Sequence, residues 1–172
     1  MNPCVHTPGV TSFRGATLTL DQQRILYRRW NGPDDMHPQE AFIGLAALLH
    51  AATTTELRLL TLDDLIPSRQ AVRFPGRSVD LVLDTATWNA LTRCLDHRAR
   101  LATDNPHVLV TRLTRTTRAP TGAAHIRDSL APVGLLPRIL RSTRLLTLAD
   151  ELDIKQLTSA LGMSYAGVAH YA

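Results

Sequence analysis

Cysteine is scarce in this chain of 172 residues. Its two cysteines, Cys4 and Cys94, have no CxxC partner, so the sequence indicates neither a disulfide framework nor a cysteine metal site. The histidines also lack a metal-ligand spacing with cysteine or acidic residues. We therefore expect no metal and no other cofactor, and we place the protein inside the cell, in the cytoplasm.

Long hydrophobic runs are missing as well. The longest apolar stretch lies near residues 41–52 and is interrupted by Gly44 and His50, which makes it too short to span a bilayer. The first ten residues have no basic segment followed by an apolar run, so no signal peptide is predicted. We expect no membrane partner.

Lysine is almost absent, because every basic residue except Lys155 is arginine. The net charge of +4 and the pI of about 9.7 favour a polyanionic partner. Arginine is the better bidentate ligand for phosphate, although codon usage in a GC-rich genome explains the bias equally well. Lys155 is therefore the single candidate for a catalytic lysine.

The hydrophobic periodicity predicts an α+β fold that is mainly helical, with a small antiparallel three-stranded sheet. Residues 1–18 are expected to be an N-terminal arm or a linker remnant, and residues 19–172 one domain. The predicted helices cover residues 20–30, 38–52, 56–60, 84–102, 121–130, 138–151, 153–161 and 164–171. The predicted strands cover residues 71–74, 77–83 and 107–111, with Pro75-Gly76 as a tight turn.

The main candidates for catalytic residues lie in the last thirty-six residues, 137–172. Arg141 lies on a predicted amphipathic helix, and Tyr171 follows it some thirty residues later. A guanidinium that holds a phosphate and a phenol that attacks it are what covalent chemistry on DNA requires. The alternatives remain open: Arg141 as a surface ion-pair arginine, and Tyr171 as an aromatic that packs on the core.

The order of these elements resembles the catalytic domain of tyrosine recombinases, the phage-type integrases. In that family an apolar helix leads into a Thr-Gly-Leu-Arg-x-Ser-Glu-Leu segment, and here the segment from His50 to Leu57 reads HAATTTEL. The family's His-x-x-Arg cluster corresponds to Arg138-Ile139-Leu140-Arg141. Its Leu-Gly-His motif corresponds to Leu161-Gly162-Met163, with Tyr171 eight residues after Met163.

The resemblance covers about residues 19–172, but several catalytic positions are changed. Thr53 stands where the family has its first arginine, and Met163 replaces a histidine. Arg77 occupies the place of the hairpin lysine, and Arg138 that of the other histidine. Arg141 and Tyr171 match the family. The resemblance therefore implies a site formed by Arg141, Tyr171, Arg77 and Arg138.

In the family, the tyrosine forms a 3′-phosphotyrosine bond during DNA integration or recombination, without a metal or an energy source. By resemblance we expect a site-specific recombinase or integrase that is catalytically degenerate, because the loss of one charge-stabilising donor typically lowers the rate by about 10²–10³. Its expected partners are double-stranded DNA and other recombinase subunits on that DNA, with nucleoid association and no small-molecule substrate. The predicted DNA contacts are Arg73, Arg77, Arg112, Arg115, Arg138 and Arg141.

Two other interpretations compete. Residues 153–171 also resemble a helix-turn-helix, which would make the chain a transcriptional regulator without catalysis. Against this, the second helix would carry no Arg, Lys, Asn or Gln to contact base edges. A protein-interaction domain that keeps an old fold is the third class. Likewise, residues 112–121 are either a solvated surface loop or a DNA contact.

Overall fold

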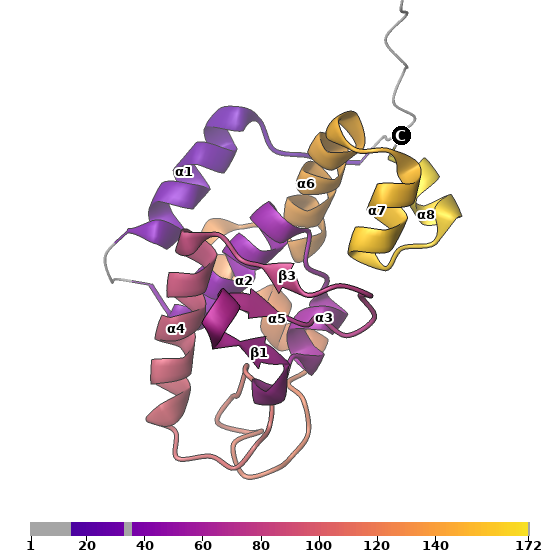
Figure 1. Cartoon of the computed structure of the whole chain (residues 1–172). Coiled ribbons are helices and arrows are strands. Elements are labelled where there is room, and N and C mark those ends of the chain that lie inside the picture. Colours follow the sequence, from indigo (N-terminus) through magenta and orange to yellow (C-terminus); the bar gives the residue numbers. More distant parts are fainter. Residues whose placement is uncertain (1–14, 33–35, 172) are drawn as a thin grey trace, which may run out of the picture.

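The computed structural model describes residues 15–32 and 36–171. Within these residues the chain is mainly helical, with one small sheet against the helices (Figure 1). The helices are α1 (Leu20–Asn31), α2 (Pro38–His50), α3 (Thr54–Leu59), α4 (Thr85–Ala99), α5 (Ala123–Ser129), α6 (Pro137–Glu151), α7 (Ile154–Leu161) and α8 (Tyr165–Ala169). Short 3₁₀ turns are η1 (Leu62–Asp64), η2 (Pro67–Arg69) and η3 (Ala131–Val133).

Side-chain caps explain where several helices begin. Thr19 accepts a hydrogen bond from the Gln22 backbone amide, and the Gln22 side chain accepts one from the Thr19 amide. This reciprocal capping box satisfies two amide donors that a helix leaves unpaired at its start. The same arrangement opens α3, where Thr53 pairs with Glu56. The predicted helix starts are therefore confirmed to within a few residues.

Helix α2 is the centre of the larger core. It is apolar almost all round, and it packs against α1, α4, α5 and α6. Trp30 of α1 lies so close to it that a Cβ on Gly44 would meet the indole ring at 2.5 Å. The predicted helix over 38–52 ends earlier, at His50, because Ala51 adopts a left-handed conformation with φ 53°.

The sheet is antiparallel and has three strands in the order β1-β2-β3. Its strands are β1 (Leu65–Ile66), β2 (Ala71–Val72) and β3 (Leu81–Val82). The predicted strand at 107–111 was wrong. His107 makes only an isolated bridge to Thr61, and Val108 donates to the Leu60 carbonyl. The third strand is β1, so the fold class is confirmed although one strand was misplaced.

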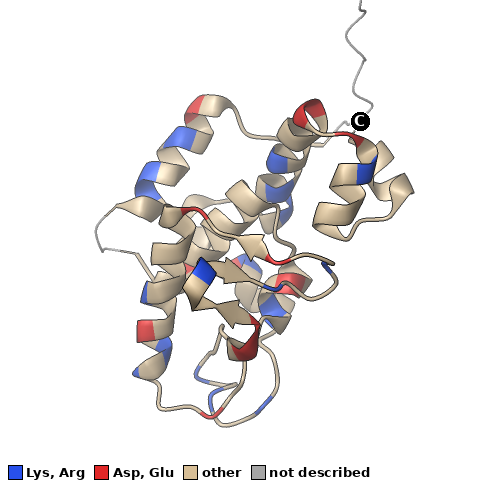
Figure 2. Ribbon diagram, in the orientation of Figure 1, with Lys and Arg blue, Asp and Glu red and all other residues tan. Residues whose placement is uncertain are grey.

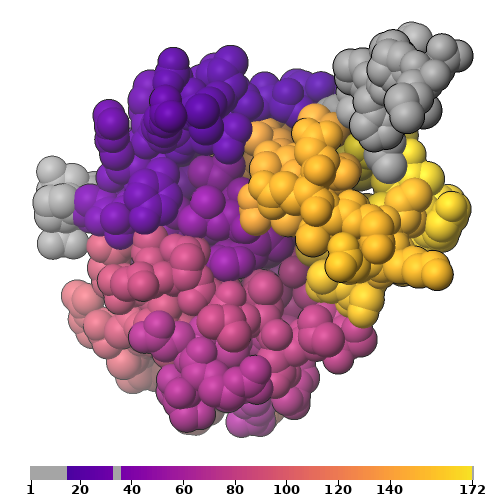
Figure 3. Space-filling view, turned by 45° about the horizontal axis from the view of Figure 1, so that its top comes forward, coloured from indigo at the N-terminus to yellow at the C-terminus, as the bar shows by residue number. Residues whose placement is uncertain are grey.

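A second, smaller core joins the last three helices to the end of α2. Leu145, Leu157, Leu161 and Val168 are buried there together with Ala51. The tip of the β2–β3 connection lies against this unit, where Ser78 Oγ donates to the Ser159 carbonyl at 3.0 Å. Figure 3 shows α6, α7 and α8 gathered at one side of the molecule. The chain segment that ends at Tyr171 is thus attached to both α2 and the hairpin.

The predicted N-terminal arm lies mostly outside the described residues, which begin at residue 15. Residues 16–19 lead into α1 without regular secondary structure. Over the described ranges, none of the helices combines the length and the apolar character that crossing a membrane requires.

Candidate functional site

The C-terminal end of α2 gathers the arginines that the sequence singles out. A helix leaves its last carbonyls without partners inside the helix, so they accept hydrogen bonds from elsewhere. Here the His50 carbonyl accepts from Nη1 and Nη2 of Arg77, each at 3.2 Å. The Ala51 carbonyl accepts from Nε of Arg141 at 3.1 Å. The structure therefore brings Arg77 and Arg141 together, although sixty-four residues separate them in sequence.

Arg77 is fully engaged by the protein. Its Nε donates to Glu56 Oε1 at 2.6 Å and its Nη2 to Glu56 Oε2 at 3.1 Å. The side chain is 2% exposed, and its guanidinium lies 5.0 Å from the centre of the Phe74 ring. Every nitrogen of the guanidinium thus has a partner, so in this arrangement Arg77 holds the hairpin onto α2 and α3.

Arg141 is only partly engaged. Its Nε is used, but neither terminal nitrogen has a hydrogen-bond partner among the residues that the structure describes. Burial lowers the pKa of Arg141, while the nearby Tyr171 and Glu56 raise it and Arg77 lowers it. A guanidinium stays protonated despite such shifts. Arg141 therefore presents a cation with up to four N–H donors next to Tyr171.

Tyr171 lies at the edge of the smaller core. It packs on the apolar cluster of α6, α7 and α8, close to Met163 and Val168. Its backbone amide donates to the Val168 carbonyl at 2.9 Å, and its ring meets that of His170 edge to face at 5.3 Å. Tyr171 as a whole is half-buried.

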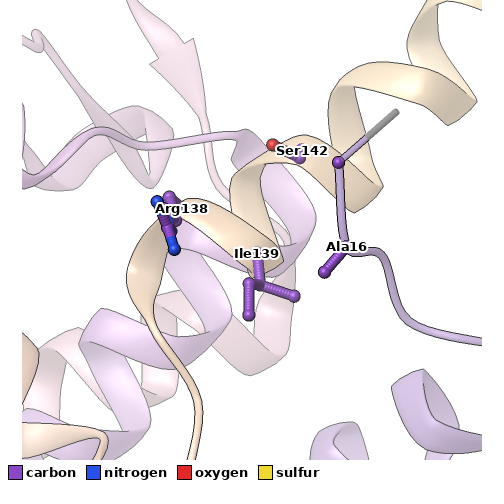
Figure 4. A pocket seen from close by; sticks show the side chains of 5 residues that line it. Ala16, Arg138, Ile139 and Ser142 are labelled. Carbon is purple, nitrogen blue, oxygen red and sulfur yellow. The ribbon is translucent and has the colours of Figure 1, made fainter. Parts of the chain in front are cut away.

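Arg138 occupies the first turn of α6 and points to a different place. It lines a hollow together with Gly15, Ala16, Ile139 and Ser142 (Figure 4). The side chain is exposed, and among the described residues it has no hydrogen-bond or ion-pair partner. Arg138 and Arg141 share a helix, but Arg141 is held against α2 whereas Arg138 faces the segment before α1.

The other predicted DNA contacts are spread over the molecule. Arg73 follows β2 and pairs with Asp80 at 2.9 Å, with 62% of its side chain exposed. Arg112 and Arg115 are exposed in the loop between α4 and α5, at the bottom of Figure 1, whereas α6 lies at the top. Figure 2 shows the basic residues on several elements rather than on one. The predicted contacts do not form one continuous patch.

Thr53 and Met163, which stand where the family has an arginine and a histidine, both have structural roles here. Thr53 caps α3 by accepting a hydrogen bond from the Glu56 amide at 3.0 Å, a role that an arginine side chain does not fill. Met163 is half-buried in the smaller core with Tyr171. Neither side chain supplies a cation or a titratable group at the place where the resemblance predicts one.

Sequence reasoning overlooked a third arginine on α6. Arg144 completes an Arg-x-x-Arg-x-x-Arg spacing with Arg138 and Arg141, a signal that was available in the sequence. It is half-buried, and its Nε is shielded from solvent without a hydrogen-bond partner within the described part of the chain. The neighbouring charges of Arg144 and Arg77 help to lower the pKa of His50.

His50 belongs to the same end of α2. Its Nε2 lies 2.8 Å from Asp84 Oδ2, and Asp84 caps α4. Burial lowers the pKa of His50, and the hydrogen bond to Asp84 opposes that shift without reversing it. Burial raises the pKa of Asp84, but hydrogen bonds from Thr87 and His50 lower it below its usual value. This pair joins α2 to α4.

The last two helices also bear on the helix-turn-helix interpretation. Helix α8 has five residues, with the sequence YAGVA, and its Val168 is buried against α7. Its other side chains offer no amide or cation to a base edge. Within residues 15–32 and 36–171, no group of three or more His, Cys, Asp or Glu residues is arranged to hold a metal ion.

Comparisons in sequence found no matching family model and no matching curated protein. Comparison of structures does find solved proteins with a similar fold. The chain is similar to XerA recombinase, with a TM-score of 0.72 and 21% identity over 91% of this chain. It is also similar to XerH site-specific recombinase bound to its difH substrate, with a TM-score of 0.71, 13% identity and 91% coverage.

A third similar structure is the Tn1549 transposon integrase in complex with transposon right-end DNA, with a TM-score of 0.66, 14% identity and 98% coverage. The chain spans 60% of the XerA chain, 50% of the XerH chain and 64% of the integrase chain. At these identities the likeness establishes the fold. The chain has the fold of tyrosine-recombinase catalytic domains, as the sequence motifs predicted.

Proposed function

We propose that this chain is a recombinase- or integrase-like protein that binds duplex DNA through backbone phosphates and is impaired in strand cleavage and rejoining. The observation that carries the proposal is Arg141 near Tyr171 in a recombinase fold, with neither terminal nitrogen of Arg141 hydrogen-bonded to any residue that the structure describes. A guanidinium with two adjacent free nitrogens matches the paired oxygens of a phosphate.

The proposed binding does not depend on base recognition. Phosphate contacts fix the position of a protein on the duplex and carry no sequence information themselves. Arg141 would hold the phosphate next to Tyr171, and the exposed Arg138 would add a second contact on the same helix. Arg73, Arg112 and Arg115 are exposed and would contribute charge at a distance from this point. Other recombinase subunits on the same DNA are proposed partners.

Impaired strand cleavage is expected from the residues at the family's catalytic positions. In the family that the chain resembles, two arginines and a histidine stabilise the transition state and a lysine protonates the leaving oxygen. Here Thr53 and Met163 provide no charge at their positions. Arg77 has its nitrogens occupied by Glu56 and by the α2 carbonyls. Arg138 cannot transfer a proton near neutral pH, because arginine does not deprotonate in proteins. Thr53, Met163, Arg77 and Arg138 therefore do not supply the charge and the proton transfer that the family obtains from the corresponding positions.

The test is retention of a labelled duplex of mixed sequence across a salt series. Wild-type protein should retain DNA, with an affinity that falls steeply as salt rises. Arg141→Gln should weaken retention about ten- to a hundredfold, since a charge-assisted hydrogen bond is worth about 1.5–3 kcal/mol. Arg127→Gln removes the same charge from a side chain that is 58% exposed and paired with Asp128, and it serves as the matched control. Equal weakening in both variants would refute a specific role for Arg141.

A further inference from the structure

A groove runs between α1 and the C-terminal end of α6, which both pack on α2 (Figure 1). Its first part is a hollow of about 360 Å³, lined among others by Gln23, Asp150 and Glu151. Its second part is a hollow of about 220 Å³, lined among others by Gln23, Arg24, Tyr27 and Arg28. Because Gln23 lines both hollows, they adjoin and form one surface, the α1–α6 groove.

The two ends of the α1–α6 groove carry opposite charge. Arg28 is exposed at one end and forms no ion pair with a residue that the structure describes. Arg24 beside it pairs with Asp21 at 3.1 Å, and both of these side chains are exposed. Asp150 and Glu151 are exposed at the other end. Figure 2 shows basic residues along α1 and acidic residues at the upper end of α6.

The acidic end of the groove is unfavourable within a single copy of the chain. Asp150 and Glu151 lie in the last turn of α6, where there is no basic residue. The helix dipole favours cations at this end of a helix and disfavours carboxylates. Over residues 15–32 and 36–171, neither carboxylate forms an ion pair or a hydrogen bond. A cation from outside the chain would therefore stabilise this end of α6.

Helix α1 also exposes several large apolar side chains. The exposed fractions are 60% for Leu20, 63% for Ile25 and 38% for Tyr27. Scattered apolar residues are ordinary on a protein surface, whereas a group of them on one short helix is typical of a surface that contacts another protein. Tyr27 lines the groove itself. The partner of the groove is thus expected to cover apolar side chains as well as to pair charges.

We propose that a second copy of this chain docks on the α1–α6 groove, with α1 of each copy packed against the end of α6 of the other. A surface pairs with itself across a two-fold axis when its two halves are complementary to each other. An axis near Gln23 exchanges the basic and the acidic end of the groove. Arg28 of each copy then faces Asp150 and Glu151 of the other copy.

This dimer does not depend on the proposed function. It requires no DNA, and it uses neither Arg141 nor Tyr171. It also differs in kind from a chain of subunits arranged head to tail, because one surface serves both copies and the assembly closes at two. Since the contacts between charges are exposed at their rim, the dimer should weaken as the salt concentration rises.

The test is sedimentation of the full chain without DNA over a range of protein concentrations. Wild type should form a dimer that dissociates on dilution. Arg28→Glu and Glu151→Lys should each raise the dissociation constant about tenfold or more, because each places like charges at both symmetric contacts. A lysine at the end of α6 suits the helix dipole, so the loss of the dimer in Glu151→Lys would not reflect a destabilised helix.

Arg127→Glu and Asp128→Lys are the matched controls. They make the same changes of charge at an exposed pair on α5, with side chains that are 58% and 63% exposed. Both controls should dimerise as wild type does. An equal mixture of Arg28→Glu and Glu151→Lys is the decisive sample. In a heterodimer of the two variants, the changed charges meet with opposite sign and the unchanged pair is kept, so the mixture should regain the dimer that each variant has lost.

Two results would overturn the proposal. A wild type that sediments as a monomer at every concentration would exclude a second copy and leave the groove to a different protein. A wild-type dimer that the mixture does not restore would place the dimer contact on another surface. Loss of DNA retention in a separate assay would refute the proposed function and would leave this result unchanged.

Discussion

The carboxylate of Glu56 decides whether the guanidinium of Arg77 has donors left for a ligand. Arg77 stands at the position that the resemblance assigns to a catalytic lysine, but Glu56 takes two of its nitrogens. Both side chains are almost fully buried, at 2% and 8% exposed. Arg141, with one carbonyl partner, keeps donors for a ligand. Arg77 and Arg141 are the same residue type, so their different availability for a ligand comes from their contacts.

Glu56→Gln tests how strongly this pair holds the hairpin. Gln can still close the capping box of α3, so the substitution removes mainly the charge opposite Arg77. A buried cation left without its counter-ion should destabilise the fold by about 3 kcal/mol, measured by urea unfolding. Asp128→Asn removes one partner of an exposed pair, at 58% and 63% exposure, and should change stability by less than about 1 kcal/mol. Similar losses in both variants would contradict the structural role of the pair.

At the scale of elements, the β2–β3 connection packs on the end of α7 because the backbones of Gly76 and Gly162 approach closely. Gly162 ends α7 with φ +61°, and a Cβ there would lie 2.3 Å from the carbonyl oxygen of Gly76. Real Cβ atoms do not approach so closely, so only glycine allows the hairpin tip to rest on the end of α7. This contact and the Ser78–Ser159 hydrogen bond position the segment that carries Tyr171.

Gly162→Ala should therefore destabilise the protein for two reasons: the strain of a left-handed backbone and the clash of the new Cβ with the Gly76 carbonyl. Gly134 provides the comparison, because its φ is +66° and a Cβ there would meet nothing within 4 Å. Gly134→Ala should lower the free energy of unfolding by about 1–2 kcal/mol, the usual left-handed penalty. Gly162→Ala should lower it further and speed hydrogen exchange in α7 and α8. Equal losses would mean that the hairpin contact is unimportant.

The elements that the sequence predicted well are those with local signals. Pro38 and a continuous apolar run predicted α2, and Thr19 with Gln22 predicted the start of α1. The strand β1 has only two residues between two 3₁₀ turns, too short for any periodicity. Residues 107–111 were assigned to a strand because they are apolar, yet their backbone contacts are with Leu60–Leu62 and not with the sheet.

The candidate site was predictable only in part, because its decisive contacts are long-range. Motif spacing pointed to Arg141 and Tyr171, and Tyr171 is one of the groups that influence the pKa of Arg141. Nothing local in the sequence indicated that Glu56 would engage Arg77 from twenty-one residues away. Arg144 was visible in the arginine spacing on α6, but the shielding of its Nε from solvent is a property of the packing.

At the scale of the whole molecule, histidines that folding partly removes from water couple stability to pH. Burial lowers the pKa of four of them below the usual value: His37, His50, His107 and His125. As pH falls through about 6.5, the unfolded chain takes up protons that the folded chain resists. The stability that is fully present above this pH is therefore lost progressively below it.

We expect the Tm to fall between about pH 7.5 and pH 5.5, followed by circular dichroism at constant ionic strength. His50→Asn should flatten this fall, because it removes one of the groups whose proton uptake favours the unfolded chain. A Tm that is constant or rises as the pH drops would contradict the lowered pKa values of these four histidines.

The central claim is that a recombinase fold holds DNA phosphates here without cleaving the strand. The most direct measurement incubates the protein with nicked duplexes of mixed sequence, which trap a covalent intermediate, and divides each sample between a native and a denaturing gel. Tyr171→Phe is the control. The account predicts salt-sensitive retention on the native gel and no DNA-linked protein on the denaturing gel. A covalent band that disappears in Tyr171→Phe would contradict impaired cleavage, and an absence of retention at low salt would contradict DNA binding.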